Sequence, residues 1–345
     1  MLRTWTVLLL TALPAAVGGA ELKEEELLGW IAAQGGRAER DQAGRIVEVD
    51  LASTWITDAD LEKISRLASL RKLNLAHTKI TDAGIEHLKP LANVSELNLY
   101  YAEYITDTAL AHVTGWKRLE VINLRGTRLT SHVFEHLARL TTLRSLDIAF
   151  TEVDDDGFEQ LSSLTKLESL ALGGNRLSGS ALSSLKLLPS LRRLDVGGMQ
   201  RVDSGRWGLA LSDENLTRLS ELTELRELSL TGANLNDRRV DRPGNKLSER
   251  IELPDVSKLR SLQNLELLDL SRTPVLPAAL TALRDLPKLR ELRLGLATRI
   301  DDTAIETLIS LKQVGSIHLG GSKVSAEGIE RFRRERPNCQ VSWWQ

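Results

Sequence analysis

The chain has 345 residues, of which 42% are hydrophobic but only 4% aromatic, so we expect a core of aliphatic side chains. The 45 Lys and Arg residues nearly balance the 47 Asp and Glu residues, which argues against a protein that binds nucleic acid through its phosphates. A single globular core rarely grows beyond roughly 250–300 residues, so this length predicts either two domains or an array of repeats.

Residues 1–20 have the order of a secretory signal peptide. Arg3 supplies a positive charge, residues 5–17 carry no charge, and three small residues follow before an acidic run. The uncharged stretch is shorter than the roughly 17–25 residues that span a bilayer, so cleavage is favoured over an uncleaved membrane anchor. We therefore expect a mature chain that begins near Glu21 and has no membrane span. It would be secreted, or would lie in the periplasm or cell envelope.

Residues 21–45 suit a cap over the first unit of an array. Leu27, Leu28 and Ile31 have the spacing of a short amphipathic helix, and a turn precedes the strand expected at 46–51. Arrays of repeats need such caps to stay soluble.

From residue 46 to residue 337 one pattern recurs eleven times. Its clearest copy is Leu-x-x-Leu-x-Leu from Leu70, followed by Thr78, Thr81-Asp82, Gly84-Ile85, Leu88 and Leu91. Units with this order begin at Ile46, Leu70, Val94, Leu119, Leu143, Leu167, Leu191, Leu225, Leu265, Leu289 and Val314. All but two of the steps between them are 24 or 25 residues, which indicates a repeat array.

Each unit divides into a strand and a helix. Leu-x-x-Leu-x-Leu alternates apolar and polar residues, which predicts a strand with one buried face. Ile85, Leu88 and Leu91 are spaced by three, which predicts a helix with a buried stripe; Thr81 would cap it and Asp82 suits its positive end. Strands stack about 4.8 Å apart and helices roughly 8–10 Å apart. The array must therefore curve, with a parallel sheet on its concave side and helices on its convex side.

This pattern resembles the leucine-rich-repeat family. At the ninth place the family usually has Asn or Cys; this chain has Asn175 but otherwise prefers Thr, at Thr78, Thr127, Thr151 and Thr273. The 24-residue Thr-Asp-x-Gly unit is similar to repeats of bacterial, notably planctomycete, proteins and of eukaryotic F-box leucine-rich proteins, although residues 1–45 carry no F-box. The resemblance covers about residues 46–345. It implies an α/β fold, a horseshoe-shaped solenoid, but says little about function because many unrelated binders share this fold.

The third, fifth and seventh places of each strand are expected to face the concave side, with the eighth at its rim. Most of these residues are small and polar, but the three tyrosines of the chain all follow Val94. Aromatic residues and Arg dominate binding energy at interfaces, so we predict a partner-binding site formed by His77, Tyr100, Tyr101, Tyr104, Arg125 and Phe150. The alternative is that Tyr101 or Phe150 turns inward and fills the loop layer.

Two neighbouring units carry insertions, at about residues 199–213 and 236–255. Both leave the strands on the same side and are rich in basic residues, so we expect them to contact each other and to belong to a binding face. The predicted partner-binding residues there are Arg201, Arg206, Trp207, Arg238, Arg239 and Arg242. The alternative is a tolerated surface loop, because long insertions cost little free energy.

Residues 338–345 are expected to form a capping strand, because Val341 and Trp343 lie one period after Ile317 and Leu319. The single cysteine, Cys339, lies at the start of this segment and cannot form an internal disulfide. Packing alone must therefore stabilise the fold.

No catalytic residue, metal site or cofactor is predicted. Residues 154–157, Asp-Asp-Asp-Gly, lack the spacing and distal Glu of a calcium loop and occupy the helix start of their unit. His87, His112 and His136 recur on the outer helices and fit a solvated face. The chain has no phosphate-binding Gly loop, zinc-type Cys/His spacing or nucleophile elbow.

The sequence therefore predicts an exported, non-catalytic scaffold that binds a protein, or a surface glycan, through its concave face and strand-to-helix loops. Two alternatives stay open. One is a recognition subunit of an enzyme complex, including an F-box-like ubiquitin-ligase adaptor, against which the export signal argues. The other is an unrecognised catalytic activity, which a deep pocket holding paired carboxylates or a His/Asp pair would favour.

Overall fold

A computed structural model shows an elongated array of short strands and helices, and it describes residues 18–198, 200–202, 205–209, 212–233 and 255–344. Within these residues, thirteen strands form one sheet. They are β1 (Arg37–Arg40), β2 (Ile46–Asp50), β3 (Lys72–Asn74), β4 (Glu96–Asn98), β5 (Val121–Asn123), β6 (Ser145–Asp147), β7 (Ser169–Ala171), β8 (Arg193–Asp195), β11 (Glu227–Ser229), β12 (Leu267–Asp269), β13 (Glu291–Arg293), β14 (Ser316–His318) and β15 (Gln340–Ser342).

The strands from β2 to β15 are parallel and follow chain order, with β8 next to β11. Equivalent places of neighbouring units pair, so that Leu146 lies between Ile122 and Leu170. All three of these side chains are buried, whereas Ser145 and Asp147 on either side of Leu146 are partly exposed. The register predicted from the sequence is therefore confirmed.

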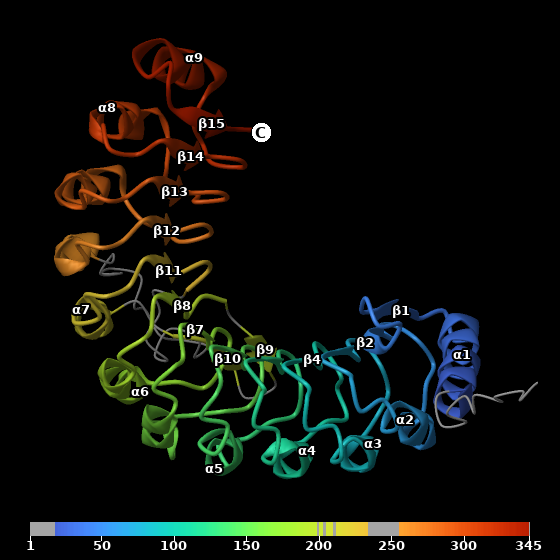
Figure 1. Ribbon diagram of the computed structural model, residues 1–345. Helices are drawn as coiled ribbons and strands as arrows, with labels where there is room; N and C mark the ends of the chain where they lie inside the picture. The colour runs from blue at the N-terminus through green and yellow to red at the C-terminus, as the bar shows by residue number, and fades with distance from the viewer. Residues whose placement is uncertain (1–17, 199, 203–204, 210–211, 234–254, 345) are drawn as a thin grey trace, which may run out of the picture.

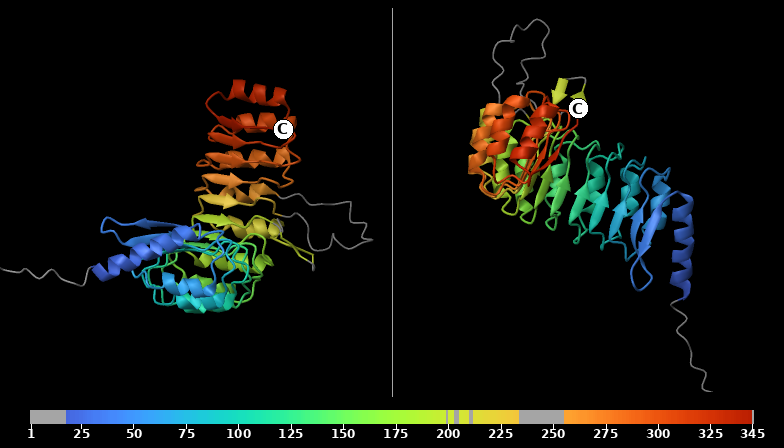
Figure 2. Two further views of the ribbon diagram at one scale, coloured as in Figure 1. Left: turned by 90° about the vertical axis from the view of Figure 1, so that its right-hand side faces the viewer. Right: turned by 90° about the horizontal axis from the view of Figure 1, so that it is seen from above.

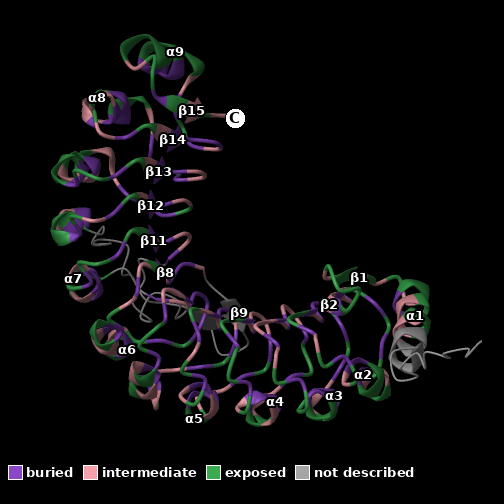
Figure 3. Ribbon diagram, viewed as in Figure 1, coloured by how far each residue is buried: buried purple, intermediate pink, exposed green. Residues whose placement is uncertain are grey.

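The helical elements lie outside the sheet, and all but the first cover its convex side, with their buried faces turned toward the strands (Figure 3). They are α1 (Gly18–Ala33), α2 (Asp58–Ile64), α3 (Asp82–His87), α4 (Asp107–Val113), α5 (Val133–Leu137), η1 (Phe158–Ser163), α6 (Gly179–Ser184), η2 (Leu185–Leu187), α7 (Asp213–Ser220), η3 (Val256–Ser261), η4 (Pro277–Asp285), η5 (Asp302–Ala304), α8 (Ile305–Ser310) and α9 (Ala326–Glu335). The elements labelled η are 3₁₀-helices, a tighter form than the α-helix that the spacing of three predicts.

The Thr-Asp pairs at the helix starts have two separate roles. Thr81 caps its own helix, since its hydroxyl accepts a hydrogen bond from the N–H of Ala83. Asp82 instead binds the following unit: one carboxylate oxygen accepts from the N–H of Thr106 at 2.8 Å, and the other accepts from its hydroxyl. The predicted cap is confirmed, and the carboxylate also links neighbouring repeats.

Asp155 has the same linking role in the Asp-Asp-Asp-Gly segment. Its carboxylate accepts hydrogen bonds from the N–H and the hydroxyl of Ser178 in the next unit. Its neighbour Asp154 exchanges hydrogen bonds with Ser131 of the preceding unit. Links between repeats therefore account for both carboxylates.

The two ends of the sheet carry additional elements. At one end, β1 pairs antiparallel with β2, and α1 lies beyond the first repeats (Figure 2). This helix begins inside the predicted signal peptide, and Ile31 on it is buried. At the other end, β15 pairs with β14, and Trp343 donates a hydrogen bond to the carbonyl oxygen of Val324 at 3.1 Å. The assignment of residues 21–45 and 338–345 as caps remains our proposal.

The array bends between two arms, one ending at β7 and the other beginning at β8 (Figure 1). The seventh places of these two units are Gly173 and Gly197. A Cβ on Gly173 would overlap the carbonyl oxygen of Gly197, and a Cβ on Gly197 would lie 2.6 Å from the backbone nitrogen of Thr231. The absence of side chains lets three successive backbones approach on the concave side, which permits the bend. We call this region the elbow.

An antiparallel hairpin of β9 (Gln200–Val202) and β10 (Gly205–Trp207) stands outside the main sheet, within the first insertion. Most of the second insertion lies outside the described residues. Among the helices that the structure describes, none has the length and apolar character needed to cross a membrane.

Candidate binding surface

Hydrogen bonds within each unit order the concave surface. The fifth-place side chain accepts a hydrogen bond from the N–H of the seventh residue, as Asn98 does from Tyr100 at 3.0 Å and Asp147 from Ala149 at 2.9 Å. The same contact is made by Asp50, Asn74, Asn123, Asp195 and Asp269. The column of Asn and Asp therefore satisfies a backbone donor in each unit where it occurs. We call this series of contacts the fifth-place ladder.

The eighth residue of every unit has a left-handed backbone, with φ between 51° and 96°. These residues are Ser53, His77, Tyr101, Gly126, Phe150, Gly174, Gly198, Gly232, Arg272, Leu296 and Gly321. Glycine adopts this conformation freely, whereas a residue with a side chain loses roughly 1–2 kcal/mol. His77, Tyr101 and Phe150 thus occupy places where the turn itself favours glycine.

Three of the predicted rings contact one another. The rings of His77 and Tyr101 are stacked, with centroids 5.8 Å apart and an angle of 12° between their planes. The ring of Tyr100 meets both edge-on, at 5.1 Å from His77 and 4.7 Å from Tyr101. Tyr100 and Tyr101 are partly exposed and His77 is exposed, so these rings lie at the surface.

Glycines in the following units make room for two of the rings. A Cβ on Gly126 would lie 2.8 Å from the ring of Tyr101. A Cβ on Gly174 would lie 2.9 Å from the ring of Phe150, and one on Gly198 would lie 2.7 Å from it. The rings therefore lie along the rim of the concave face, over the eighth residues of the next units, and are not turned into the core.

Arg125 connects the rim to the concave face. Its guanidinium lies 4.4 Å from the ring centroid of Phe150 and 3.7 Å from the carboxylate of Asp147. Burial raises the pKa of the Asp147 carboxyl, although the hydrogen bond from Ala149 and the charge of Arg125 act in the opposite direction. We call His77, Tyr100, Tyr101, Arg125 and Phe150 together the aromatic ridge.

Tyr104 lies apart from the stacked rings. It is 47% exposed, and the guanidinium of Arg128 lies 5.7 Å from its ring centroid. Trp55, two units earlier, is 81% exposed and has the ammonium of Lys79 at 4.9 Å from its ring centroid. Trp55 was not predicted from the sequence, although it directly follows the eighth and ninth residues of its unit. That place in the loop is the signal that would have identified it.

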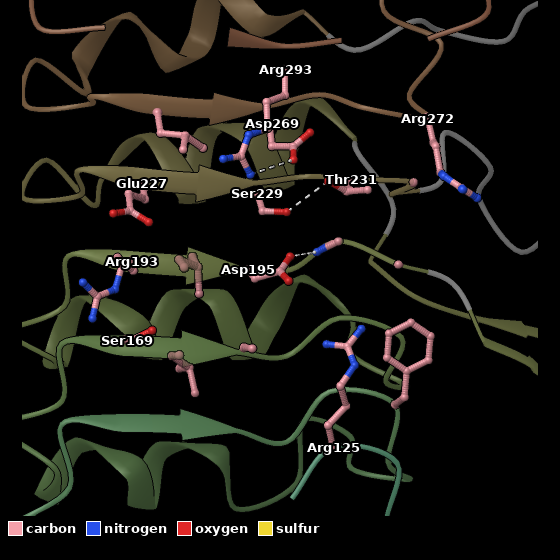
Figure 4. Close-up of a pocket in the computed structure, with 18 of the residues that line it drawn as sticks. Arg125, Ser169, Arg193, Asp195, Glu227, Ser229, Thr231, Asp269, Arg272 and Arg293 are labelled. Atoms are coloured by element: carbon pink, nitrogen blue, oxygen red, sulfur yellow. Dashed lines mark hydrogen bonds and ion pairs between the residues drawn. The ribbon is translucent and has the colours of Figure 1, made fainter. Parts of the chain in front are cut away.

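A hollow of about 1110 Å³ occupies the elbow beside the aromatic ridge (Figure 4). Arg125 and Phe150 belong to its wall, so the ridge and the hollow are continuous. The other charged residues of its lining are Arg193, Asp195, Glu227, Asp269, Arg272 and Arg293. Cations and anions are nearly balanced, and Arg293 lies 3.8 Å from Asp269. The surface therefore carries both positive and negative side chains and has no strong net charge.

The structure brings together only part of the predicted site. His77, Tyr100, Tyr101, Arg125 and Phe150 form one surface, whereas Tyr104 faces solvent nearby. Arg201, Arg206 and Trp207 lie on the β9–β10 hairpin, but their side chains are outside the described part of the chain. The remaining predicted residues of the insertions, Arg238, Arg239 and Arg242, also lie outside it, as does the predicted contact between the two insertions.

One arrangement of catalytic residue types lies away from the hollow. The Nδ1 atom of His318 lies 2.8 Å from the hydroxyl of Ser342, and its Nε2 atom lies 3.2 Å from the carboxylate of Glu291. That carboxylate also accepts a hydrogen bond from Arg293 at 2.7 Å. His318 and Ser342 are surface residues and do not line the hollow.

Comparisons with known proteins concern the fold. A family model described as a leucine-rich repeat matches residues 66–89 and 139–162. No curated protein matches the chain in sequence. An internalin from Listeria monocytogenes is similar in structure, with 17% identity, a TM-score of 0.48 and coverage of 96% of this chain and 98% of the internalin.

Two further solved structures have lower TM-scores. A leucine-rich-repeat protein from Leptospira interrogans is 21% identical, with a TM-score of 0.43 and coverage of 81% of this chain and 74% of that protein. The complex of PEPR1 with AtPEP1 is 20% identical, with a TM-score of 0.45 and coverage of 83% of this chain and 36% of that one.

The family model and the geometry of the repeats agree. Each matched segment contains one strand of the sheet, β3 or β6, and all or most of the helical element after it, α3 or η1. Equivalent strands recur in register along the sheet. The chain therefore has the fold of a leucine-rich-repeat solenoid, and two of its repeats match the leucine-rich-repeat family model.

Proposed function

We propose that this protein is a scaffold that binds another protein through the aromatic ridge and the adjoining hollow. The observation that supports this is the contact at the surface among the rings of His77, Tyr100 and Tyr101, of which the first and last lie on left-handed turns. Rigid aromatic groups lose little conformational entropy on binding and contribute large contact areas. Arg125, held against Phe150, adds the other residue type that dominates interface energies.

We propose further that the protein acts outside the cytoplasm, as a secreted or envelope protein. Residues 1–20 support this by their order of charge, apolar stretch and small residues. The basic insertions would then contribute to the encounter with the partner through their charge, since long-range attraction acts mainly on association rates.

Site-specific cross-linking tests the surface while the partner is still unidentified. A photoreactive amino acid replaces Tyr104, beside the ridge, or Glu135, an exposed residue of the convex helix α5. The labelled protein is added to intact cells and envelopes of the source organism and irradiated. We expect protease-sensitive adducts from position 104 and none from position 135. Equal adducts from both positions would contradict the proposal, and adducts sensitive to periodate but not to protease would assign a glycan instead.

Alanine variants then measure how much the ridge contributes. Tyr100→Ala and Arg125→Ala should each weaken binding of the captured partner by about 2 kcal/mol or more, the range of interface hot spots. Tyr100→Ala should leave folding nearly unchanged, because its ring lies at the surface. Surface plasmon resonance gives the affinities and thermal unfolding the stability. Parent-like affinity of both variants would show that the ridge is not the contact.

A further inference from the structure

The fifth-place ladder is interrupted inside the hollow. Asp147 and Asp195 each accept the N–H of the seventh residue in their units, but the unit between them has Ala171 at the fifth place. Its methyl group cannot accept a hydrogen bond. Ala171 lines the hollow, so open space lies where the other units carry an Asn or Asp side chain.

The interruption leaves a backbone donor without an acceptor. Within the part of the chain that the structure describes, the N–H of Gly173 donates to no other group, although the residue is buried. A buried donor that loses its acceptor costs roughly 1–3 kcal/mol when no other acceptor replaces it. A bound group that accepts this hydrogen bond would recover that free energy.

The same interruption occurs two strands further on. At the fifth place of β11 the hydroxyl of Ser229 donates to the hydroxyl of Thr231 at 3.2 Å, and no described group accepts the N–H of Thr231. Ser229 and Thr231 also line the hollow (Figure 4). Backbone donors therefore alternate with the carboxylates of Asp147, Asp195 and Asp269 across the elbow.

The charges around Gly173 determine which kind of group, anionic, cationic or neutral, could accept its hydrogen bond. An anion there would lie between Asp147 and Asp195, each about one strand spacing of 4.8 Å away. These two carboxylates already repel each other, since the charge of Asp195 adds to the effect of burial in raising the pKa of Asp147. A cation would face the N–H dipole and the guanidinium of Arg125, which is 3.7 Å from Asp147. Both kinds of ion are therefore disfavoured.

We propose that the hollow binds an amide of the partner, from an Asn or Gln side chain or from extended backbone, whose oxygen accepts from Gly173 and whose N–H donates to Asp195. An amide is neutral and carries an acceptor and a donor side by side, which matches the alternation of donors and carboxylates. One oxygen of Asp195 already accepts from Gly197 at 2.9 Å, and its second oxygen faces the hollow. This inference rests on the proposed function and specifies which chemistry the hollow would recognise.

NMR of the backbone amide of Gly173 tests the chemistry with three small probes: acetamide, acetate and methylammonium. Acetamide should shift the Gly173 resonance in a saturable way, and should affect Gly197 less because its N–H is already bonded. A larger effect of acetate or methylammonium would overturn the inference. So would the absence of any shift with acetamide.

Ala171→Asn tests the site in the protein. Asn stands at the fifth place of β3, β4 and β5, so the variant should fold and its side chain should accept the N–H of Gly173. The acetamide shift should disappear, and the cross-linked partner should bind at least tenfold more weakly. Ser169→Asn is the matched control, because it adds the same group to β7 at the third place, in the wall of the same hollow.

The variants separate this inference from the proposed function. If Tyr100→Ala loses the partner while Ala171→Asn retains it, the ridge binds the partner and the amide site is wrong. If Ser169→Asn weakens binding as much as Ala171→Asn, added bulk explains the loss and the amide site is again wrong. If position 104 gives no adducts, the proposed binding function is wrong. The amide site can still be tested separately, because the NMR titration of Gly173 with acetamide needs no partner.

Discussion

Leu146 and Ser145 are adjacent residues of β6 with opposite surroundings. Leu146 is 1% exposed and packs between Ile122 and Leu170, whereas Ser145 faces the concave side. Leu146→Ala should lower the free energy of unfolding by roughly 2–5 kcal/mol, through lost transfer energy and the cavity left behind. Ser145→Ala should change it by less than about 0.5 kcal/mol. Urea unfolding measures both, and equal losses would contradict the register of the sheet.

Asp147 offers a prediction with a defined sign. Its pKa is raised by burial, so the folded protein holds the proton more tightly than the unfolded chain does. The free energy of unfolding must then fall as pH rises from the ordinary Asp pKa through the raised value. Asp147→Asn removes this titration and keeps an oxygen for the N–H of Ala149. We expect the variant to gain stability relative to the parent as pH rises above the ordinary Asp pKa, measured by urea unfolding.

Asp60 provides a control of opposite sign. Its pKa is lowered, chiefly by the hydrogen bond from Lys63, so its contribution to stability is present above the ordinary Asp pKa and is lost as pH falls. Asp60→Asn should therefore be less stable than the parent by a constant amount above the ordinary Asp pKa, and this difference should shrink as pH falls below it. If Asp147→Asn behaved in this way too, its ion pair with Arg125 would outweigh burial.

For single residues, the sequence predicts burial better than it predicts backbone conformation. Alternation placed Leu146 inside because burial on a strand follows a period of two. The left-handed backbone of His77, Tyr101 and Phe150 was not predictable, since the residues themselves disfavour it. The turn shared by all units imposes it. The exposure of Trp55 was not predicted because it lies in the loop after the turn, where neither the strand period nor the helix period applies.

The helix starts are the elements whose sequence signal carried most information. Thr-Asp predicted a cap, and the cap exists, but the link from Asp82 to Thr106 depends on the distance between repeats, which one unit of sequence does not contain. The sequence also did not predict whether a unit forms an α-helix or a 3₁₀-helix. A spacing of three suits both forms, so η4 and α4 have the same signature in sequence.

Asp82→Ala tests the link between repeats. The variant removes the acceptor for the N–H and the hydroxyl of Thr106, and should lower the free energy of unfolding by about 0.5–2 kcal/mol, as loss of a helix cap does. Glu86→Ala on the exposed face of the same helix is the control and should stay within about 0.5 kcal/mol. Urea unfolding compares the two, and equal small effects would show that the carboxylate does not link the units.

The shape of the whole molecule combines a feature that the sequence predicts with one that it does not. Curvature follows from the different spacings of strands and helices, so an arc was expected. The elbow depends on the contact of Gly173 with Gly197, and glycine at one place of a repeat does not reveal how closely two backbones approach. The hollow lies at this elbow (Figure 1). The sequence therefore did not predict the part of the binding surface that depends on curvature.

Gly173→Ala should therefore change the shape of the molecule. The added Cβ would overlap the carbonyl oxygen of Gly197, which is backbone and cannot rotate away, so β7 and β8 must separate on the concave side. Overpacking of this kind costs about 1–3 kcal/mol. We expect the elbow to open and the two arms to move apart, which small-angle X-ray scattering would record as a larger radius of gyration.

Gly295→Ala is the matched control for the elbow. Gly295 holds the same seventh place in the C-terminal arm, but a Cβ there would meet nothing closer than 3.5 Å, so the variant should keep the parent's scattering curve and stability. A partner that contacts both arms should bind Gly173→Ala more weakly and Gly295→Ala as well as the parent. If Gly173→Ala instead kept the parent's radius of gyration, the curvature would be set by the convex helices, and the close approach of the glycines would be its consequence rather than its cause.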